Sequence, residues 1–162
     1  MANERHTLTA LVDNEAGVLA RVVGLFSGRG YNIESLTVGE VDATEGTSRI
    51  TIVTSGPPQV IEQIEAQLKR LVPVHAVTNW TSATDGIERE MALVKAAGAD
   101  RAAAKAAAEK FGARVLDDRG QATVFELTDA PARISGFIEA MRPLGLIDVS
   151  RTGVAAISRD TA

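Results

Sequence analysis

The chain has 162 residues, a formal net charge of −4, no cysteine and 45% hydrophobic residues. This length allows one ordinary domain or two small ones, and the composition is that of a folded globular protein. The absence of cysteine excludes disulfide scaffolds, thiolate zinc sites and cysteine nucleophiles, and two histidines are too few for a multi-histidine metal site.

The mild acidity disfavours nucleic acid as a partner, because nucleic-acid-binding surfaces are basic. Residues 1–17 are charged and only briefly apolar, which is not the pattern of a signal peptide. No run of about 18 apolar residues occurs, so we expect no membrane partner and no transmembrane helix. The expected compartment is the cytoplasm.

The first half of the chain predicts the order strand, helix, strand, strand, helix, strand. Its strands are expected within 7–12, 31–42, 48–55 and 74–81, and the apolar stripes of its helices fall within 18–26 and 60–71. Gly28 and Gly30 end the first helix, and Gly39 is a candidate for a bulge or bend in the strand that follows. This order is the ferredoxin-like arrangement.

The second half repeats this order. Its strands are expected at 89–96, 114–118, 122–128 and 146–158, the last with a bulge at Gly153. Asp100 caps a helix that Gly112 ends, and Pro131 begins another. The predicted fold class is therefore α+β, with two ferredoxin-like βαββαβ domains over 1–81 and 87–162 and a polar linker over 82–86.

Each predicted domain is a four-stranded antiparallel sheet with two helices on one face. A domain of about 75 residues buries only about 60% of its extended-chain surface, so its core is small. The other face of each sheet is not strongly polar. We therefore expect sheet edges or faces to pair, either between the two halves or between chains.

Catalytic chemistry has little support in the sequence. No Gly-x-Ser-x-Gly motif occurs, and neither His6 nor His75 has a nucleophile nearby in the sequence. The pair Asp117-Asp118 precedes Arg119-Gly120, which predicts a solvated hairpin rather than a magnesium site. Phosphate-binding loops open a helix, whereas the clustered glycines here close one. RNA-binding modules of this topology stack bases on aromatic residues that strand 48–55 lacks.

One loop remains as a candidate site. Asn14-Glu15-Ala16-Gly17 joins a strand end to a helix start, where free backbone N–H groups attract a carboxylate. Asn14 offers both donors and an acceptor, Val18 and Leu19 offer an apolar wall, and Asn32 offers a second amide. The alternative is structural: Asn14 only caps the helix and Gly17 only turns the chain.

A family resemblance supports the ligand-binding interpretation. VDNEAGVLARVVGLFSGRGYNIESLTVGEVD closely resembles the start of the acetolactate synthase small, regulatory subunit. TSRITIVTSG, VIEQIEAQLKRLVPVHAV and EREMALVKA match the same family in order, and SRTGVAAISR fits its usual ending. The resemblance is very specific to about residue 96, and looser over the alanine-rich remainder.

This resemblance implies that the first domain is an ACT domain, an amino-acid-binding ferredoxin-like module. It implies a non-catalytic subunit that activates a catalytic large subunit and confers inhibition by valine or another branched-chain amino acid. Thiamine diphosphate, Mg²⁺ and FAD are then held by the large subunit, with no cofactor on this chain. The implied partners are that large subunit and a second copy of this chain, joined through the ACT domains.

Carried over onto this sequence, the implied effector site comprises eight residues: Asn14, Glu15, Ala16, Gly17, Val18, Leu19, Asn32 and Ile33. Asn32 and Ile33 are implied to come from the neighbouring subunit. The alternatives are a free-standing ACT-type amino-acid sensor with another partner, and an acylphosphatase-like hydrolase. The hydrolase is disfavoured because Glu15 in the first loop would repel phosphate.

Overall fold

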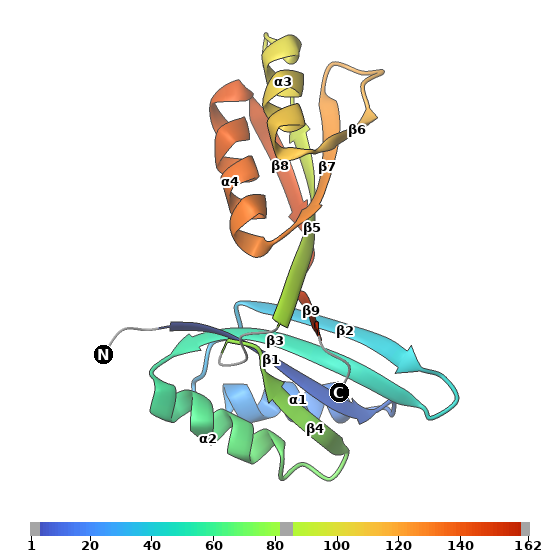
Figure 1. Ribbon diagram of the computed structural model, residues 1–162, viewed down its shortest axis with the longest axis vertical. Coiled ribbons are helices and arrows are strands. Elements are labelled where there is room, and N and C mark those ends of the chain that lie inside the picture. Colours follow the sequence, from blue (N-terminus) through green and yellow to red (C-terminus); the bar gives the residue numbers. More distant parts are fainter. Residues whose placement is uncertain (1–3, 82–85, 160–162) are drawn as a thin grey trace. The chain divides into compact units, whose positions relative to one another are not determined.

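The computed structural model describes residues 4–81 and 86–159, and these form two compact units (Figure 1). Of the described residues, the first unit contains 4–81, 86–87 and 154–159, and the second contains Glu88–Gly153. The predicted linker at 82–86 lies outside the described residues except for Gly86, which begins a strand.

The first unit has the predicted order of elements. They are β1 (Glu4–Asp13), α1 (Val18–Ser27), β2 (Ser35–Asp42), β3 (Thr47–Gly56), α2 (Pro58–Leu68) and β4 (Val74–Asn79). The sheet has the strand order β2-β3-β1-β4, and each strand is antiparallel to its neighbours. In Figure 1 both helices lie on the same side of this sheet. The ferredoxin-like order is confirmed.

Successive side chains of the two central strands, β1 and β3, point alternately to the helix-covered face of the sheet and to its opposite face. Leu8 is paired with Ile52, and both are fully buried beneath the helices with Val22, Phe26 and Ile64. The expected bend in β2 is a register shift between Glu40 and Asp42, rather than at Gly39.

The second unit has the same topology. Its elements are β5 (Gly86–Ala96), α3 (Arg101–Phe111), β6 (Arg114–Asp117), β7 (Thr123–Asp129), α4 (Pro131–Met141), the 3₁₀ helix η1 (Arg142–Leu144) and β8 (Leu146–Arg151). The strand order is β6-β7-β5-β8. Its core contains Val94, Phe125 and Phe137, all without exposed surface.

The closing strand predicted over 146–158 is instead two strands. β8 ends at Arg151, and β9 (Ala155–Ser158) pairs with β5 after a break at Thr152–Val154. Val154 is fully buried against Val53 of the first unit's sheet. The residues from Val154 onward therefore group with the first unit, which differs from the expected division that placed all of 87–162 in the second domain.

Helix α3 provides a direct test of the local signals. The Asp100 carboxylate accepts a hydrogen bond from the Ala103 amide at 2.9 Å, and Gly112 ends the helix in the left-handed conformation. We expect Asp100→Ala to lower the free energy of unfolding by about 1 kcal/mol, because the amide loses its cap. Denaturant titration measures this, and Asp100→Asn, which keeps an accepting oxygen, should retain most of the stability.

Candidate functional site

The predicted loop lies at the end of β1, and no side chain caps the helix that follows it. The N-cap residue is Gly17, at φ 88°, and this left-handed conformation favours glycine. The Asn14 side chain is directed to Glu40 instead, so the structural alternative in which Asn14 caps α1 is wrong.

The start of α1 is open to an anion. The first backbone bond within the helix runs from the Arg21 amide to the Gly17 carbonyl at 3.1 Å, which leaves the preceding amides of the first turn without helical partners. Of these, the Val18 amide donates to the Glu15 carbonyl at 3.4 Å. No acidic residue lies in this turn. Within the first turn, no side-chain carboxylate offsets the partial positive charge of the helix start, and the nearest acidic residue in the loop is the exposed Glu15.

Four contacts from distant parts of the sequence hold the end of β1 and the loop in place, one of them from the Asp13 amide to the Pro73 carbonyl at 2.9 Å. The Asn14 amide donates to the Gly46 carbonyl at 2.7 Å, and the Asn14 side chain donates to Glu40 Oε1 at 3.4 Å. His75 Nε2 lies 2.6 Å from Asp13 Oδ1. Sequence reasoning missed Glu40, Gly46 and His75, because only the strand register brings them to this loop.

The side chains of the predicted loop differ in their exposure. Asn14, Glu15, Ala16 and Gly17 are exposed, and Leu19 is 40% exposed. Val18 is only 4% exposed and packs in the core, so its side chain does not form the apolar wall that we predicted. Leu19 and the methyl group of Ala16 offer the exposed apolar surface here.

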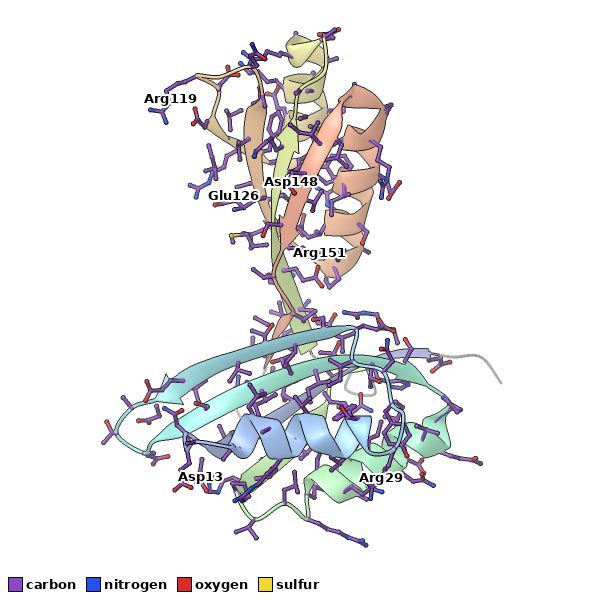
Figure 2. All side chains as sticks on the ribbon, turned by 180° about the vertical axis from the view of Figure 1, so that it is seen from behind. Asp13, Arg29, Arg119, Glu126, Asp148 and Arg151 are labelled. Carbon is purple, nitrogen blue, oxygen red and sulfur yellow. The ribbon has the colours of Figure 1, made fainter. Side chains whose placement is uncertain are left out.

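Asn32 and Ile33 lie at the opposite end of the sheet. Asp13 is paired with Thr47, whereas Ser35 is paired with Val53, six residues further along β3. At about 3.3 Å per residue, the two positions are about 20 Å apart along the strands. Figure 2 shows the same separation, with Asp13 and Arg29 at opposite ends of α1. One chain therefore does not bring the two predicted parts of the site together.

The segment before β2 is fixed by its backbone. The Asn32 carbonyl accepts a hydrogen bond from the buried Thr54 hydroxyl at 2.7 Å, and the Glu34 amide donates to the Val53 carbonyl at 2.8 Å. Asn32 itself is exposed, and Ile33 is partly buried against the core. The Asn32 side chain is therefore presented to solvent from a well-anchored backbone.

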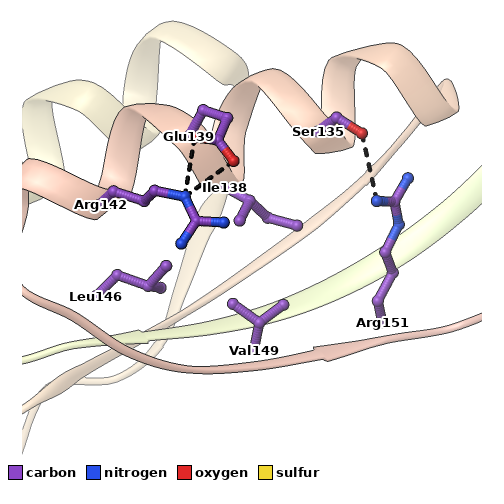
Figure 3. A pocket seen from close by; sticks show the side chains of 7 residues that line it. All are labelled: Ser135, Ile138, Glu139, Arg142, Leu146, Val149 and Arg151. Carbon is purple, nitrogen blue, oxygen red and sulfur yellow. Dashed lines mark hydrogen bonds and ion pairs between the residues drawn. The ribbon is translucent and has the colours of Figure 1, made fainter.

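A pocket of about 330 Å³ in the second unit contains none of the predicted residues (Figure 3). It is lined by Ser135, Ile138, Glu139, Arg142, Leu146, Val149 and Arg151. Arg142 Nε donates to both Glu139 oxygens, at 2.9 and 2.8 Å, and Arg151 is paired with the buried Glu90. Each guanidinium has its own carboxylate partner, so the pocket has no uncompensated charge to attract a charged effector.

The acidic pair is a structural hairpin, as predicted. Asp117 is paired with Arg119, and Asp118 with Lys105 and Arg101. Among the residues that the structure describes, no group of three or more His, Cys, Asp and Glu side chains could hold a metal ion.

The Lys105 ammonium, hydrogen-bonded to Asp118, holds the pKa of that carboxyl below its usual value. A lowered pKa means that this pair stabilises the fold at neutral pH and that its contribution is lost as the pH falls through the folded-state pKa. We expect Lys105→Gln to raise the Asp118 pKa, as measured by carboxyl NMR titration. Lys110→Gln on the same helix is the control and should leave it unchanged.

Comparisons with known proteins cover both halves of the chain. A family model described as an AHAS small subunit-like ACT domain matches residues 8–76, and one described as the small subunit of acetolactate synthase matches residues 89–160. The chain is 40% identical over 158 residues to the acetolactate synthase isozyme 3 small subunit of Escherichia coli, covering 96% of each chain. It is 39% identical over 157 residues to a probable acetolactate synthase small subunit of Archaeoglobus fulgidus, covering 96% of this chain and 97% of the relative.

The chain belongs to the acetolactate synthase small-subunit family. The crystal structure of the acetolactate synthase small subunit from Thermotoga maritima supports the assignment, with a TM-score of 0.86 at 35% identity over 98% of this chain and 99% of that one.

The resemblance seen in the sequence is thereby confirmed, and so is the expectation of a regulatory chain rather than a catalytic one. A small subunit implies a catalytic large subunit as its partner. Within the described part of the small subunit, no helix is long and apolar enough to cross a membrane.

Proposed function

We propose that this small subunit activates the catalytic large subunit of acetolactate synthase and makes it sensitive to valine. The observation that supports the proposal most is the open start of α1, where an exposed loop precedes backbone amides that no side chain caps. An amino-acid carboxylate placed there meets the positive end of the helix.

The surroundings of the loop suit the rest of an aliphatic amino acid. Glu40, held beside Asn14, supplies the negative charge that an ammonium group needs. The exposed part of Leu19 offers apolar contact to a branched side chain. The loop therefore presents complementary groups for a carboxylate, an ammonium and an alkyl chain.

A second copy of the chain completes the site in this proposal. β2 is an edge strand, and Val38 and Val41 on it are 45% and 51% exposed, so the edge is suited to pairing. Two β2 strands related by a two-fold axis run antiparallel and form one continuous sheet. This pairing brings the partner subunit's Asn32 and Ile33 to the end of β2 where Glu40 holds the loop, and removes the 20 Å separation.

Valine bound between two chains regulates by favouring one arrangement of the dimer over another. The required coupling is about 1–3 kcal/mol, which one ligand with a charged and an apolar part can supply. In the same proposal, thiamine diphosphate, Mg²⁺ and FAD belong to the large subunit, and this chain contributes regulation alone.

Reconstitution tests the proposal. The purified chain, added to the large subunit, should raise acetolactate formation, and valine should then lower it in a saturable manner, with leucine and isoleucine compared alongside. If the chain binds valine but neither binds nor activates the large subunit, the alternative of a free-standing amino-acid sensor is correct. If valine has no effect on the activated complex, the effector assignment is wrong.

A further inference from the structure

The side of the first sheet that faces away from α1 and α2 is covered by the end of the described chain. We call residues Val154–Ser158 the strap. Val154 has no exposed surface and Ala156 has 5%, and both pack with Val53 of β3 and with Trp80 in a small second core. Figure 1 shows β9, which forms most of the strap, on the opposite side of this sheet from the helices.

The strap contacts the segment that carries Asn32. The Val154 amide donates to the Ser35 hydroxyl oxygen at 3.3 Å, and Ser35 is the first residue of β2. Val53 packs against the strap, and its carbonyl accepts a hydrogen bond from the Glu34 amide. The hydroxyl of the next residue, Thr54, donates a hydrogen bond to the Asn32 carbonyl. The strap and the Asn32 segment therefore share one contact residue of β3, Val53.

Residues 32–34 belong to neither helix nor strand. The hydrogen bonds to β3, the packing of Ile33 against the core and the start of β2 therefore fix the backbone from which the Asn32 side-chain amide extends. A small shift of Val53 or Ser35 moves that amide relative to a ligand held by another chain. Sites that place polar groups against a ligand lose affinity with displacements of this kind.

We propose that the strap is a positioning element of the effector site, with Val154 and Ser35 as positioning residues that set the placement of Asn32. The proposal rests on the function proposed above, because it assigns Asn32 to the valine site. It adds a task for the C-terminal end of the chain, which lies far in sequence from every predicted effector residue.

The test uses the full chain assembled with the large subunit. Val154→Ala and Ser35→Ala are each expected to raise the valine concentration for half-inhibition about three- to tenfold. Activation without valine should remain at the wild-type level, because Val154 is buried and Ser35 half-buried, so neither change alters a surface open to the large subunit. Ile157→Ala is the matched control on the same strap, since its side chain is 57% exposed, and it should behave as wild type.

A conservative variant separates positioning from general stability. Ser35→Thr keeps a hydroxyl for the Val154 amide, so its valine sensitivity should be close to that of the wild type. Its melting temperature should be close to that of Ser35→Ala, so that a difference in valine sensitivity between the two variants does not reflect stability. The NMR signal of the Asn32 side-chain amide should shift in Val154→Ala and Ser35→Ala, and stay in place in Ile157→Ala.

The outcomes distinguish this proposal from the proposed function. If the wild-type complex is insensitive to valine, the effector function itself fails. If the wild type is inhibited and both alanine variants are half-inhibited at the same valine concentration as the wild type, the strap does not position the site. Loss of activation together with valine sensitivity, or a failure of Ser35→Thr to restore sensitivity, also overturns the proposal.

Discussion

Gly17→Asp is expected to raise the valine concentration for half-inhibition at least about tenfold, equivalent to about 1.4 kcal/mol of binding free energy. Nothing lies within 4 Å of the position that a Cβ would take, so the new side chain has room. Its carboxylate would lie at the start of α1, where the proposed site holds the carboxylate of valine, and the two charges repel. Activation of the large subunit should be largely unchanged.

Gly17→Asn separates charge from backbone strain. Aspartate and asparagine at position 17 would each place a side chain on a backbone in the left-handed conformation, at φ 88°. Asparagine has nearly the shape of aspartate without its charge. We expect Gly17→Asn to retain clearly more valine sensitivity than Gly17→Asp. Equal losses would show that the conformation of the turn matters and that the carboxylate of the effector does not lie there. Inhibition titrations of the two complexes make the comparison.

Val38→Lys is expected to break the proposed dimer and, with it, to abolish the proposed inhibition by valine. Val38 lies beside the midpoint of β2, so a two-fold pairing of these edges brings it close to its own copy. Two lysines introduced there repel and remove apolar contact, and lysine on an edge strand generally opposes pairing. Sedimentation velocity at micromolar concentration measures the change in mass.

Val72→Lys is the matched control, because it is the same substitution at a side chain that is 94% exposed and outside any strand. It should remain a dimer with normal inhibition. A dimeric Val38→Lys variant would show that the chains pair through another surface, and the completion of the site by the partner subunit's Asn32 would then fail with it.

The order of the elements could be predicted from the sequence because its signals are local. Ile50 and Ile52 alternate onto the core face as expected, Asp100 caps α3, and Pro131 begins α4. Each of these features is decided by residues close together in the sequence, through capping residues or through apolar residues that recur at helical or strand spacing.

Features that depend on strand register were not visible in the sequence. Glu40 and His75 brace the loop at Asp13-Asn14 only because β2 and β4 end beside it. Val154 lies in a break within what the sequence predicts as one strand, and its burial depends on Val53, about a hundred positions away in the sequence. Local periodicity carries no information about such long-range contacts.

In the proposed arrangement two chains share each valine site, and mixed dimers test this sharing. Gly17→Asp damages one half of the site and Asn32→His the other, so a homodimer of either variant has no intact site. A heterodimer has one site with both changes and one with neither. Random mixing of the two variants should therefore restore about a quarter of the wild-type valine sites, measured by calorimetry. If the mixture binds no more valine than the separate variants, each site belongs to one chain and the proposed sharing of sites between chains is wrong.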